Sequence, residues 1–348
     1  MRADRGPGAL LSGFAGLAIA LCISFALVVA LILCMSRSPL STISSFFLGA
    51  FANRYALGNM LNAAVPLVFT GLGIAVAFKA SVFNLGGEGQ VYIGGLAATA
   101  VCLALPGANG WLGGAAALVA GMAISGVLAG LSGFFRMKWG ADEMISSFLL
   151  SSAVILVTNY LITGPLDDPT NNLLATRAIA PQFAFSRIFL PSRLNGSAPL
   201  ALLAVGAVFV FVSKTHMGYE MRMCGLNREF ARYGGINVSR YLVLPMIISG
   251  ALHGLGGGLM ILGTYRAGIE GYSFGTGWNG IAVALLARNN PLAVLPAALL
   301  FAYLGAGANA AMLNGDITFE IATVAQSFIF YFVTAQALYG IVRARRRL

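Results

Sequence analysis

The chain is a series of long apolar runs separated by short polar connections. A helix of roughly 20 apolar residues crosses the ~30 Å hydrocarbon layer of a membrane, and most of these runs reach or approach that length. The pattern predicts ten membrane helices, of which the eighth is only half-length. In chain order they are Leu10–Met35, Leu57–Phe78, Ala80–Leu105, Trp111–Phe135, Met144–Thr163, Ala198–Ser213, Tyr241–Gly263, Gly275–Ala287, Pro291–Leu313 and Ile321–Val342.

Composition supports an all-α, polytopic transmembrane helical bundle. Hydrophobic residues make up 58% of the 348 positions and charged residues only 9%, against about a quarter in an ordinary soluble domain. The apolar runs hold many of the 44 glycines, and small residues let helix backbones approach closely in lipid. We therefore expect residues 1–348 to form a single transmembrane domain. The four cysteines have no paired spacing and the two histidines have no neighbouring ligands, so no metal site is predicted.

The distribution of lysine and arginine predicts the orientation of the chain. With the N-terminus inside, 15 of the 21 basic residues fall in cytoplasmic connections and 6 on the opposite side. We therefore place both termini in the cytoplasm, with the chain a multi-pass protein of the cell membrane. The net charge of +10 follows from this bias, so it gives no support to nucleic-acid binding.

Three connections between the apolar runs have a character of their own. Residues 164–199 form the longest outside segment and are expected to be an ordered external loop. Residues 36–56 are also external, and the apolar Phe46–Leu48 predicts a short helix lying in the membrane interface. Residues 214–240 form a long inside segment in which helix formers are broken by Gly-Leu-Asn and Gly-Gly. This pattern predicts two short amphipathic helices with a turn between them.

The string VFNLGGEGQ, from Val82 to Gln90, places a carboxylate inside an apolar run. If the third helix begins after Lys79, Glu88 lies nine residues further, roughly 13 Å deep at 1.5 Å per residue. An ionisable group at that depth must face protein or water. The surrounding glycines predict a broken helix, which membranes tolerate only where it is buried or lines a cavity.

Three interpretations of this string stay open. Asn84, Glu88 and Gln90 are candidates for contacting a polar solute in transit. Glu88 alone is a candidate for proton coupling, although no second acid or lysine accompanies it inside the membrane. The alternative is structural: Glu88 caps or bridges the backbone groups that the break in the helix leaves free.

A second interrupted element lies in the other half of the chain. Residues 277–291 read as a half-length helix, a turn and a new helix, and Trp278 and Asn279 stand at its start. Short or Gly/Pro-interrupted segments in both halves indicate a central transport pathway, so these two side chains are also pathway candidates. His253 lies among glycines and is interpreted as a neutral histidine packed against a neighbouring helix.

No catalytic arrangement is visible in the sequence. The chain lacks the Gly-x-x-x-x-Gly-Lys-Ser/Thr loop that binds ATP phosphates, and we predict neither enzyme activity nor a bound cofactor. Energy for uphill transport must then come from an ion gradient or from a partner subunit.

Three motifs resemble those of one family of transporters. Residues 79–90 are similar to the FNIGxEGQ string of the ABC importer permeases for branched-chain amino acids, sugars and nucleosides. MRMCGLNREFARYGGI (221–236) resembles the same group's RAVGLNPxAARYAGI segment, and GIAVALLARNNP (280–291) resembles its GIAVALLGxNNP element. The similarity is closest to permeases for nucleosides and simple sugars. The departures are Met223-Cys224, Arg228 and Arg288, and none removes a group that transport needs.

The resemblance implies a permease subunit that works by alternating access and leaves ATP hydrolysis to a partner. The partners that it implies are an ATP-binding-cassette ATPase, a second permease chain, a periplasmic or lipid-anchored substrate-binding protein, and the surrounding membrane lipid. We expect the second permease chain to be non-identical to this one. The 214–240 segment would dock on the ATPase, with Gly225 and Leu226 as the turn that seats in it. Its candidate contact residues are Glu220, Arg222, Gly225, Leu226, Asn227, Arg228, Glu229 and Arg232.

The expected cargo is an uncharged polyhydroxylated solute, first a nucleoside and second a simple sugar, because the candidate pathway holds Asn, Gln, Ser and aromatic residues. The alternative function is an ion-coupled secondary transporter of a small polar solute, which rests on the membrane architecture and on Glu88.

Overall fold

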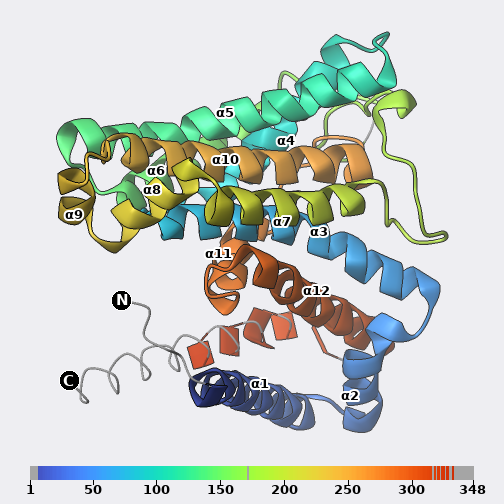
Figure 1. The fold of residues 1–348 in the computed structure, drawn as a ribbon. Coiled ribbons are helices and arrows are strands. Elements are labelled where there is room, and N and C mark those ends of the chain that lie inside the picture. The colour runs from blue at the N-terminus through green and yellow to red at the C-terminus, as the bar shows by residue number, and fades with distance from the viewer. Residues whose placement is uncertain are drawn as a thin grey trace. The chain divides into compact units, whose positions relative to one another are not determined.

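The computed structural model describes residues 7–170 and 172–315, together with residues 317, 318, 320, 321, 323–325, 327, 328, 331 and 332 (Figure 1). Helices and loops make up this part of the chain, apart from three isolated β-bridges. Two compact units are present, one formed by Met1–Met60 with Leu300–Leu348 and one by Leu61–Leu299. The all-α prediction is confirmed.

The helices follow one another closely along the chain. Their bounds are α1 Pro7–Met35, α2 Pro39–Leu48, α3 Arg54–Lys79, α4 Gly87–Ala104, α5 Gly110–Trp139, α6 Glu143–Thr163, α7 Ser197–Lys214, α8 His216–Leu226, α9 Arg228–Tyr233, α10 Arg240–Met260, α11 Thr276–Leu286 and α12 Pro291–Asn314. Short 3₁₀ or π turns add η1 Gly49–Phe51, η2 Pro181–Phe183 and η3 Ile261–Tyr265.

Among the described residues, six helices are long and apolar enough to cross a membrane: Arg54–Lys79, Gly110–Trp139, Glu143–Thr163, Ser197–Lys214, Arg240–Tyr265 and Pro291–Asn314. Pro39–Phe51 and Thr276–Leu286 are shorter apolar helices, and Leu21–Met35 is an apolar stretch within α1. The polytopic architecture is therefore confirmed, and the eighth predicted helix is indeed short. The tenth, Ile321–Val342, lies outside the continuously described residues. The orientation of the termini stays a prediction.

The third predicted helix begins later than the apolar pattern indicates. Helix α3 ends at Lys79, and Ser81 then takes a left-handed conformation with φ of 52°. Residues 82–86 are not helical, and α4 begins only at Gly87. The expected helix from Ala80 is therefore wrong, because the turn at Ser81 ends helical geometry while the residues stay apolar. Glu88 consequently lies in the first turn of a helix and not in its middle.

Glycine sets the packing of the larger unit, in which α10 packs against both α5 and α4. A Cβ atom added at Gly254 on α10 would lie 2.2 Å from the Gly121 carbonyl oxygen of α5 and 2.5 Å from the hydroxyl of Ser125. The same position faces Gly94 of α4. Backbones that approach this closely are typical of membrane helix pairs with small interface residues.

We expect Gly254→Leu to prevent normal packing of α10. The added side chain would have to displace two helix backbones, and overpacking of this kind costs about 1–3 kcal/mol or more. The measurement is the melting temperature and the yield of monodisperse protein in detergent. Gly206→Leu on α7 is the matched control, because nothing lies within 4 Å of a Cβ atom there. Equal behaviour of the two variants would contradict the packing role.

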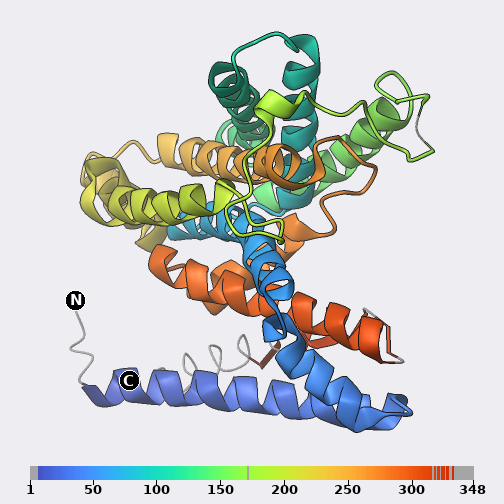
Figure 2. The same ribbon diagram turned by 90° about the vertical axis from the view of Figure 1, so that its right-hand side faces the viewer.

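Residues 164–196 form a loop with defined backbone contacts, apart from residue 171, which is not described, and α7 begins at Ser197; the external position of the loop stays a prediction. Its backbone pairs with the segment after α10, through Thr176 N–H to Gly268 O at 2.8 Å and Ile179 N–H to Arg266 O at 2.8 Å. Phe183 is buried against Gly113 of α5. Figures 1 and 2 show this loop at one end of the larger unit and helices α8 and α9 at the opposite end.

The smaller unit contains the short helix expected near Phe46, here α2. Phe46 is buried, and a Cβ atom at Gly307 would lie 2.3 Å from its carbonyl oxygen. The hydroxyl of Tyr303 donates to the Phe47 carbonyl at 3.0 Å, whereas Leu48 is exposed. The Phe46–Leu48 run therefore packs largely inside its unit, and an interfacial position for α2 stays a prediction.

Candidate functional site

The N-terminal first turns of α4 and α11 meet within the larger unit. Gly277, in the first turn of α11, lies against the first turn of α4, where a Cβ atom added to it would be 2.2 Å from the Glu88 nitrogen and 2.3 Å from the Gly87 carbonyl carbon. Only glycine permits this approach. The two interrupted elements that the sequence singles out, one in each half of the chain, are therefore in direct contact.

The Glu88 carboxylate caps the N-terminus of α11. It accepts the Ser273 hydroxyl at 2.5 Å, the Gly275 N–H at 3.0 Å and the Gly277 N–H at 2.8 Å. The N-terminal N–H groups of a helix lack partners within the helix and carry a partial positive charge, so a carboxylate is a favourable partner. We name this arrangement of four residues the Glu88 cap.

Of the three interpretations of Glu88, this geometry supports capping. The side chain is only 7% exposed, and its two oxygens share three donors. The capped groups belong to α11 and not to the break before α4 that the sequence suggested. Solute contact by Glu88 in another conformation and proton coupling stay predictions.

Asn84 and Gln90 are joined by a pair of amide hydrogen bonds. The Asn84 amide donates to Gln90 Oε1 at 2.8 Å and receives from Gln90 Nε2 at 2.9 Å. Asn84 also donates to the Ser249 hydroxyl on α10 at 2.9 Å and accepts the Gly86 N–H at 3.0 Å. Both side chains are buried. Their polar groups thus stabilise the non-helical segment against α4 and α10, and their contact with solute stays a prediction.

A polar stripe on α6 holds the other side of this segment. Glu143 accepts the Phe83 N–H at 3.2 Å, Ser147 accepts the Leu85 N–H at 3.0 Å, and Ser151 accepts the Gly89 N–H at 2.8 Å. Glu143 also pairs with Arg136 of α5. Sequence reasoning missed these residues, although their spacing of four places them on one helix face and was a usable signal.

His253 of α10 is buried against α3 and α4, which confirms that it packs against neighbouring helices. Its Nδ1 lies 2.7 Å from the Ser249 carbonyl oxygen. Added Cβ atoms at Gly73 and Gly87 would both lie within 3 Å of the ring. The imidazole thus fills space that two glycines leave open.

Trp278 and Asn279 lie at the start of α11 and are more exposed than the other three pathway candidates, Asn84, Glu88 and Gln90. Trp278 is 37% exposed, and its ring centre is 5.8 Å from that of Phe148 on α6. Asn279 is partly exposed. Among the five pathway candidates, these two alone present side-chain surface outside the protein interior in this conformation.

The 214–240 segment forms two short helices, α8 and α9, as predicted. Asn227 separates them and accepts the Phe230 N–H at 3.0 Å as the N-cap of α9. The expected turn at Gly225 and Leu226 is wrong, because both residues belong to α8. Gly225 packs on the chain before α4, where a Cβ atom would lie 2.1 Å from the Lys79 carbonyl oxygen, whereas Leu226 is 80% exposed.

Two hydrogen bonds join this segment to the corner between α3 and α4. The Ser81 hydroxyl donates to the Gly225 carbonyl at 2.7 Å, and the Arg228 guanidinium donates to the Ser81 carbonyl at 2.9 Å. The corner leads directly into the non-helical segment and Glu88. A displacement of α8 and α9 would therefore move the segment of residues 82–88, which ends at Glu88.

The other candidate residues of the segment have separate surroundings. Glu220 accepts the Tyr241 hydroxyl of α10, and exposed Glu229 and Arg232 form an ion pair at 3.2 Å. Arg222 is partly exposed. Burial, and secondarily Glu220, raises the pKa of the Cys224 thiol, so this departure from the family string places a protonated, packed side chain there. Within the described residues, no group of three or more His, Cys, Asp or Glu gathers as metal ligands do.

Comparison with known proteins identifies the class. Residues 56–338 match the family described as the branched-chain amino acid transport system permease component, and the chain belongs to this family. It is therefore a multi-pass cell-membrane permease component of an ABC transporter for small solutes, not the catalytic subunit, and it works with ATPase and binding-protein partners.

Three relatives span most of the chain. "Probable riboflavin import permease protein RfuC" of Treponema pallidum is 33% identical over 91% of this chain and 84% of its own length. The guanosine ABC transporter permease protein NupP of Bacillus subtilis is 30% identical over 91% and 92%. The glucose ABC transporter permease protein TsgB13 of Haloferax volcanii is 29% identical over 88% and 83%. None of these matches supports the alternative of an ion-coupled secondary transporter.

Proposed function

We propose that this permease imports a nucleoside by alternating access, driven by an ATPase that binds helices α8 and α9. The observation that carries the proposal is the pair of hydrogen bonds between this helix pair and Ser81. These two bonds connect α8 and α9, which present exposed side chains to a partner, directly to the chain that enters the interior of the larger unit.

Movement is transmitted in three steps. The ATPase shifts α8 and α9, and Gly225 and Arg228 carry the shift to the Ser81 corner. The corner displaces the non-helical residues 82–86, whose backbone N–H groups donate to side chains of α6. Glu88 then passes the displacement to the N-terminus of α11. Such a chain of fixed contacts favours movement of α11 as a unit, as rigid-body gating requires.

The aromatic pair of Trp278 and Phe148 supports a nucleoside as the cargo. A planar base gains about 1–3 kcal/mol by stacking on an aromatic side chain, and Asn279, the next residue of α11, is a partly exposed polar residue. The solutes named for two relatives agree with this chemistry, since guanosine and riboflavin both combine a flat heterocycle with a polyhydroxylated chain or ring. A simple sugar is the second choice, in line with the glucose permease.

The remaining partners follow from the same assembly. The ordered 164–199 loop, at the end of the unit opposite α8 and α9, is the proposed landing surface for the loaded binding protein (Figure 1). A second, non-identical permease chain completes the translocation pathway.

Uptake in reconstituted vesicles tests the function. Vesicles holding the permease with its ATPase and second permease are given binding protein and radiolabelled nucleoside or glucose. We expect nucleoside uptake that requires internal ATP and binding protein. Uptake driven by an ion gradient without ATP would reject the mechanism, and ATP-dependent uptake of glucose alone would reject the cargo.

Trp278→Ala is expected to lower nucleoside uptake about tenfold, because loss of one stacking contact costs about 1–3 kcal/mol and 1.4 kcal/mol corresponds to a factor of ten. Trp278→Phe should keep most of the activity. Trp111→Ala is the control, since Trp111 is 87% exposed at the start of α5. Wild-type uptake by Trp278→Ala would remove this residue from the pathway.

A further inference from the structure

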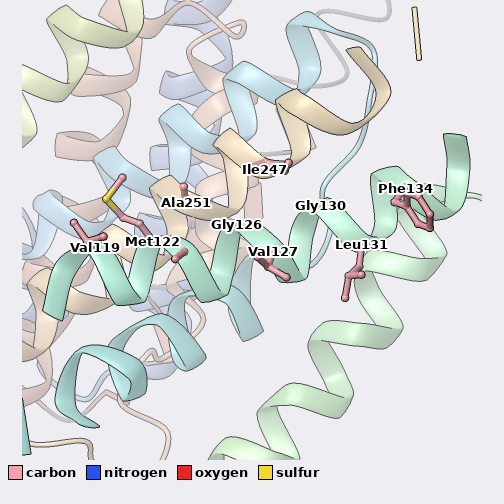
Figure 3. Close-up of a pocket in the computed structure, with 10 residues that line it drawn as sticks. Val119, Met122, Gly126, Val127, Gly130, Leu131, Phe134, Ile247 and Ala251 are labelled. Atoms are coloured by element: carbon pink, nitrogen blue, oxygen red, sulfur yellow. The ribbon is translucent and has the colours of Figure 1, made fainter. Parts of the chain in front are cut away.

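A groove with purely apolar walls runs along the paired helices α5 and α10. It has a volume of about 560 Å³ and is lined by Val119, Met122, Ala123, Gly126, Val127, Gly130, Leu131, Phe134, Ile247 and Ala251. We call it the α5–α10 groove. Figure 3 shows its α5 side chains in a row from Val119 at one end to Phe134 at the other, with Ile247 and Ala251 on the neighbouring helix.

The groove exists because its floor has almost no side chains. Gly126 and Gly130 lie against Ile247, where an added Cβ atom at Gly130 would come within 2.7 Å of the Ile247 side chain. These glycines are therefore already used in bringing α5 and α10 together. The rim is formed by branched residues that stay open to the outside, with Val119 61% and Val127 63% exposed.

The length of the groove suits a lipid acyl chain. Val119 and Phe134 are 15 residues apart on α5, which corresponds to about 22 Å at 1.5 Å per residue. One leaflet of a membrane has roughly 15 Å of hydrocarbon, half of a ~30 Å core. A flexible chain that starts near Phe134 would thus stay in contact with the groove through its whole leaflet.

The Phe134 end of the groove carries a cation at the position of a lipid headgroup. The Lys138 ammonium lies 5.7 Å from the ring centre of Phe134 and 5.1 Å from that of Trp139. Lys138 is four residues beyond Phe134, about 6 Å along the helix axis. Interfacial Trp beside Lys is the pattern of a membrane boundary.

The nearby acids are engaged elsewhere. Asp142 accepts the Met144 and Ile145 N–H groups at the start of α6, and Glu143 pairs with Arg136. In the described part of the chain, Lys138 forms no salt bridge. The cation is therefore available to an anion of the membrane surface.

We propose that the α5–α10 groove binds an anionic phospholipid, with one acyl chain in the groove and the phosphate at Lys138. The choice of lipid over a second permease chain follows from the small residues. Helix pairs in membranes associate through small residues that let backbones approach, and the glycines here already contact α10. A charged headgroup also complements Lys138, which an apolar helix face would not.

The test uses the full chain purified in detergent with its partner subunits. Lipids that copurify are counted by native mass spectrometry, and melting temperature is followed on adding phosphatidylglycerol or phosphatidylcholine. We expect phosphatidylglycerol to bind preferentially to the wild type. Lys138→Gln should reduce the preference for phosphatidylglycerol over phosphatidylcholine about fivefold. One basic residue contributes about 1 kcal/mol of attraction to anionic lipid, and about 1.4 kcal/mol corresponds to a factor of ten in binding. Lys138→Arg should keep the preference.

Filling the groove separates it from the general lipid annulus. Ala123→Leu should lower the amount of bound phospholipid, whereas Ala116→Leu, at an exposed α5 position outside the lining, should leave it unchanged. Equal binding of the two lipids to the wild type, or unchanged binding by Ala123→Leu, would overturn the proposal. Dissociation of permease chains by Ala123→Leu would show instead that the groove is a subunit interface, and would also overturn it.

Discussion

Replacing Glu88 with glutamine is expected to lower both the thermal stability of the permease and its transport rate, the latter by more than tenfold. The carboxylate accepts three hydrogen bonds through two oxygens. Glutamine keeps one acceptor oxygen and turns an NH₂ group toward backbone N–H donors. Hydrogen bonds to a charged group contribute about 1.5–3 kcal/mol, and a buried donor without a partner costs a similar amount.

Measurements on Glu88 variants distinguish its three interpretations. A capping role predicts a lower melting temperature for Glu88→Gln, a partial recovery in Glu88→Asp, and a smaller loss, about 1 kcal/mol, for Ser273→Ala, which leaves both backbone donors in place. Solute contact predicts a raised KM at unchanged melting temperature. Proton coupling predicts that the pH dependence of uptake disappears in Glu88→Gln. A Glu88→Gln protein as stable and active as wild type would refute the Glu88 cap.

Charge reversal at Arg228 is expected to uncouple ATP hydrolysis from transport. Arg228→Glu removes the donor to the Ser81 carbonyl and places a carboxylate against a carbonyl oxygen. The complex should still assemble, because the large exposed side chains Leu226, Phe230 and Tyr233 remain. Nucleoside uptake and binding-protein-stimulated ATPase activity should fall at least tenfold. Glu229→Arg, which only breaks an exposed ion pair, should have a much smaller effect.

Assembly itself depends on the exposed apolar residues of the segment. We expect Leu226→Glu to prevent copurification of the ATPase, since Leu226 is 80% exposed at the end of α8. Ile188→Glu is the control, because it places the same charge on a similarly exposed residue of the opposite loop. If charge reversal at both Arg228 and Glu229 leaves assembly and stimulated ATPase activity unchanged, the coupling role of α8 and α9 is wrong.

Several features followed from local pattern because their causes are local. Long apolar runs predicted the six described helices that are long and apolar enough to cross a membrane, and the Gly-Leu-Asn break predicted two short helices in the 214–240 segment. The apolar run around Glu88 indicated that its carboxylate must face protein or water, but it left capping, solute contact and proton coupling open. The sequence predicts Asn227 to be part of the coupling segment, but only the structure shows that its side chain caps the N-terminus of α9.

Other features depend on contacts between residues far apart in the chain. The donors to Glu88 lie 185 to 189 residues further along, so no local pattern names them. The late start of α4 depends on the turn at Ser81 and on hydrogen bonds that the Phe83 and Leu85 N–H groups donate to side chains of α6. The sequence predicts a turn at Gly225 because glycine is frequent in turns. In the structure Gly225 lies inside α8, and glycine is needed there because the Lys79 carbonyl leaves no space for a side chain.

The sequence by itself determined the polytopic all-α architecture, the family motifs and the requirement that Glu88 face protein or water and not lipid. These follow from apolar length and from the cost of burying polar groups, which are properties of single segments. Tertiary structure alone decided that Glu88 caps α11, that Ser81 joins α8 and α9 to the non-helical segment, and that α5 and α10 form a groove ending at Lys138. Each of these is a choice of partner, which depends on which backbones approach one another in the fold.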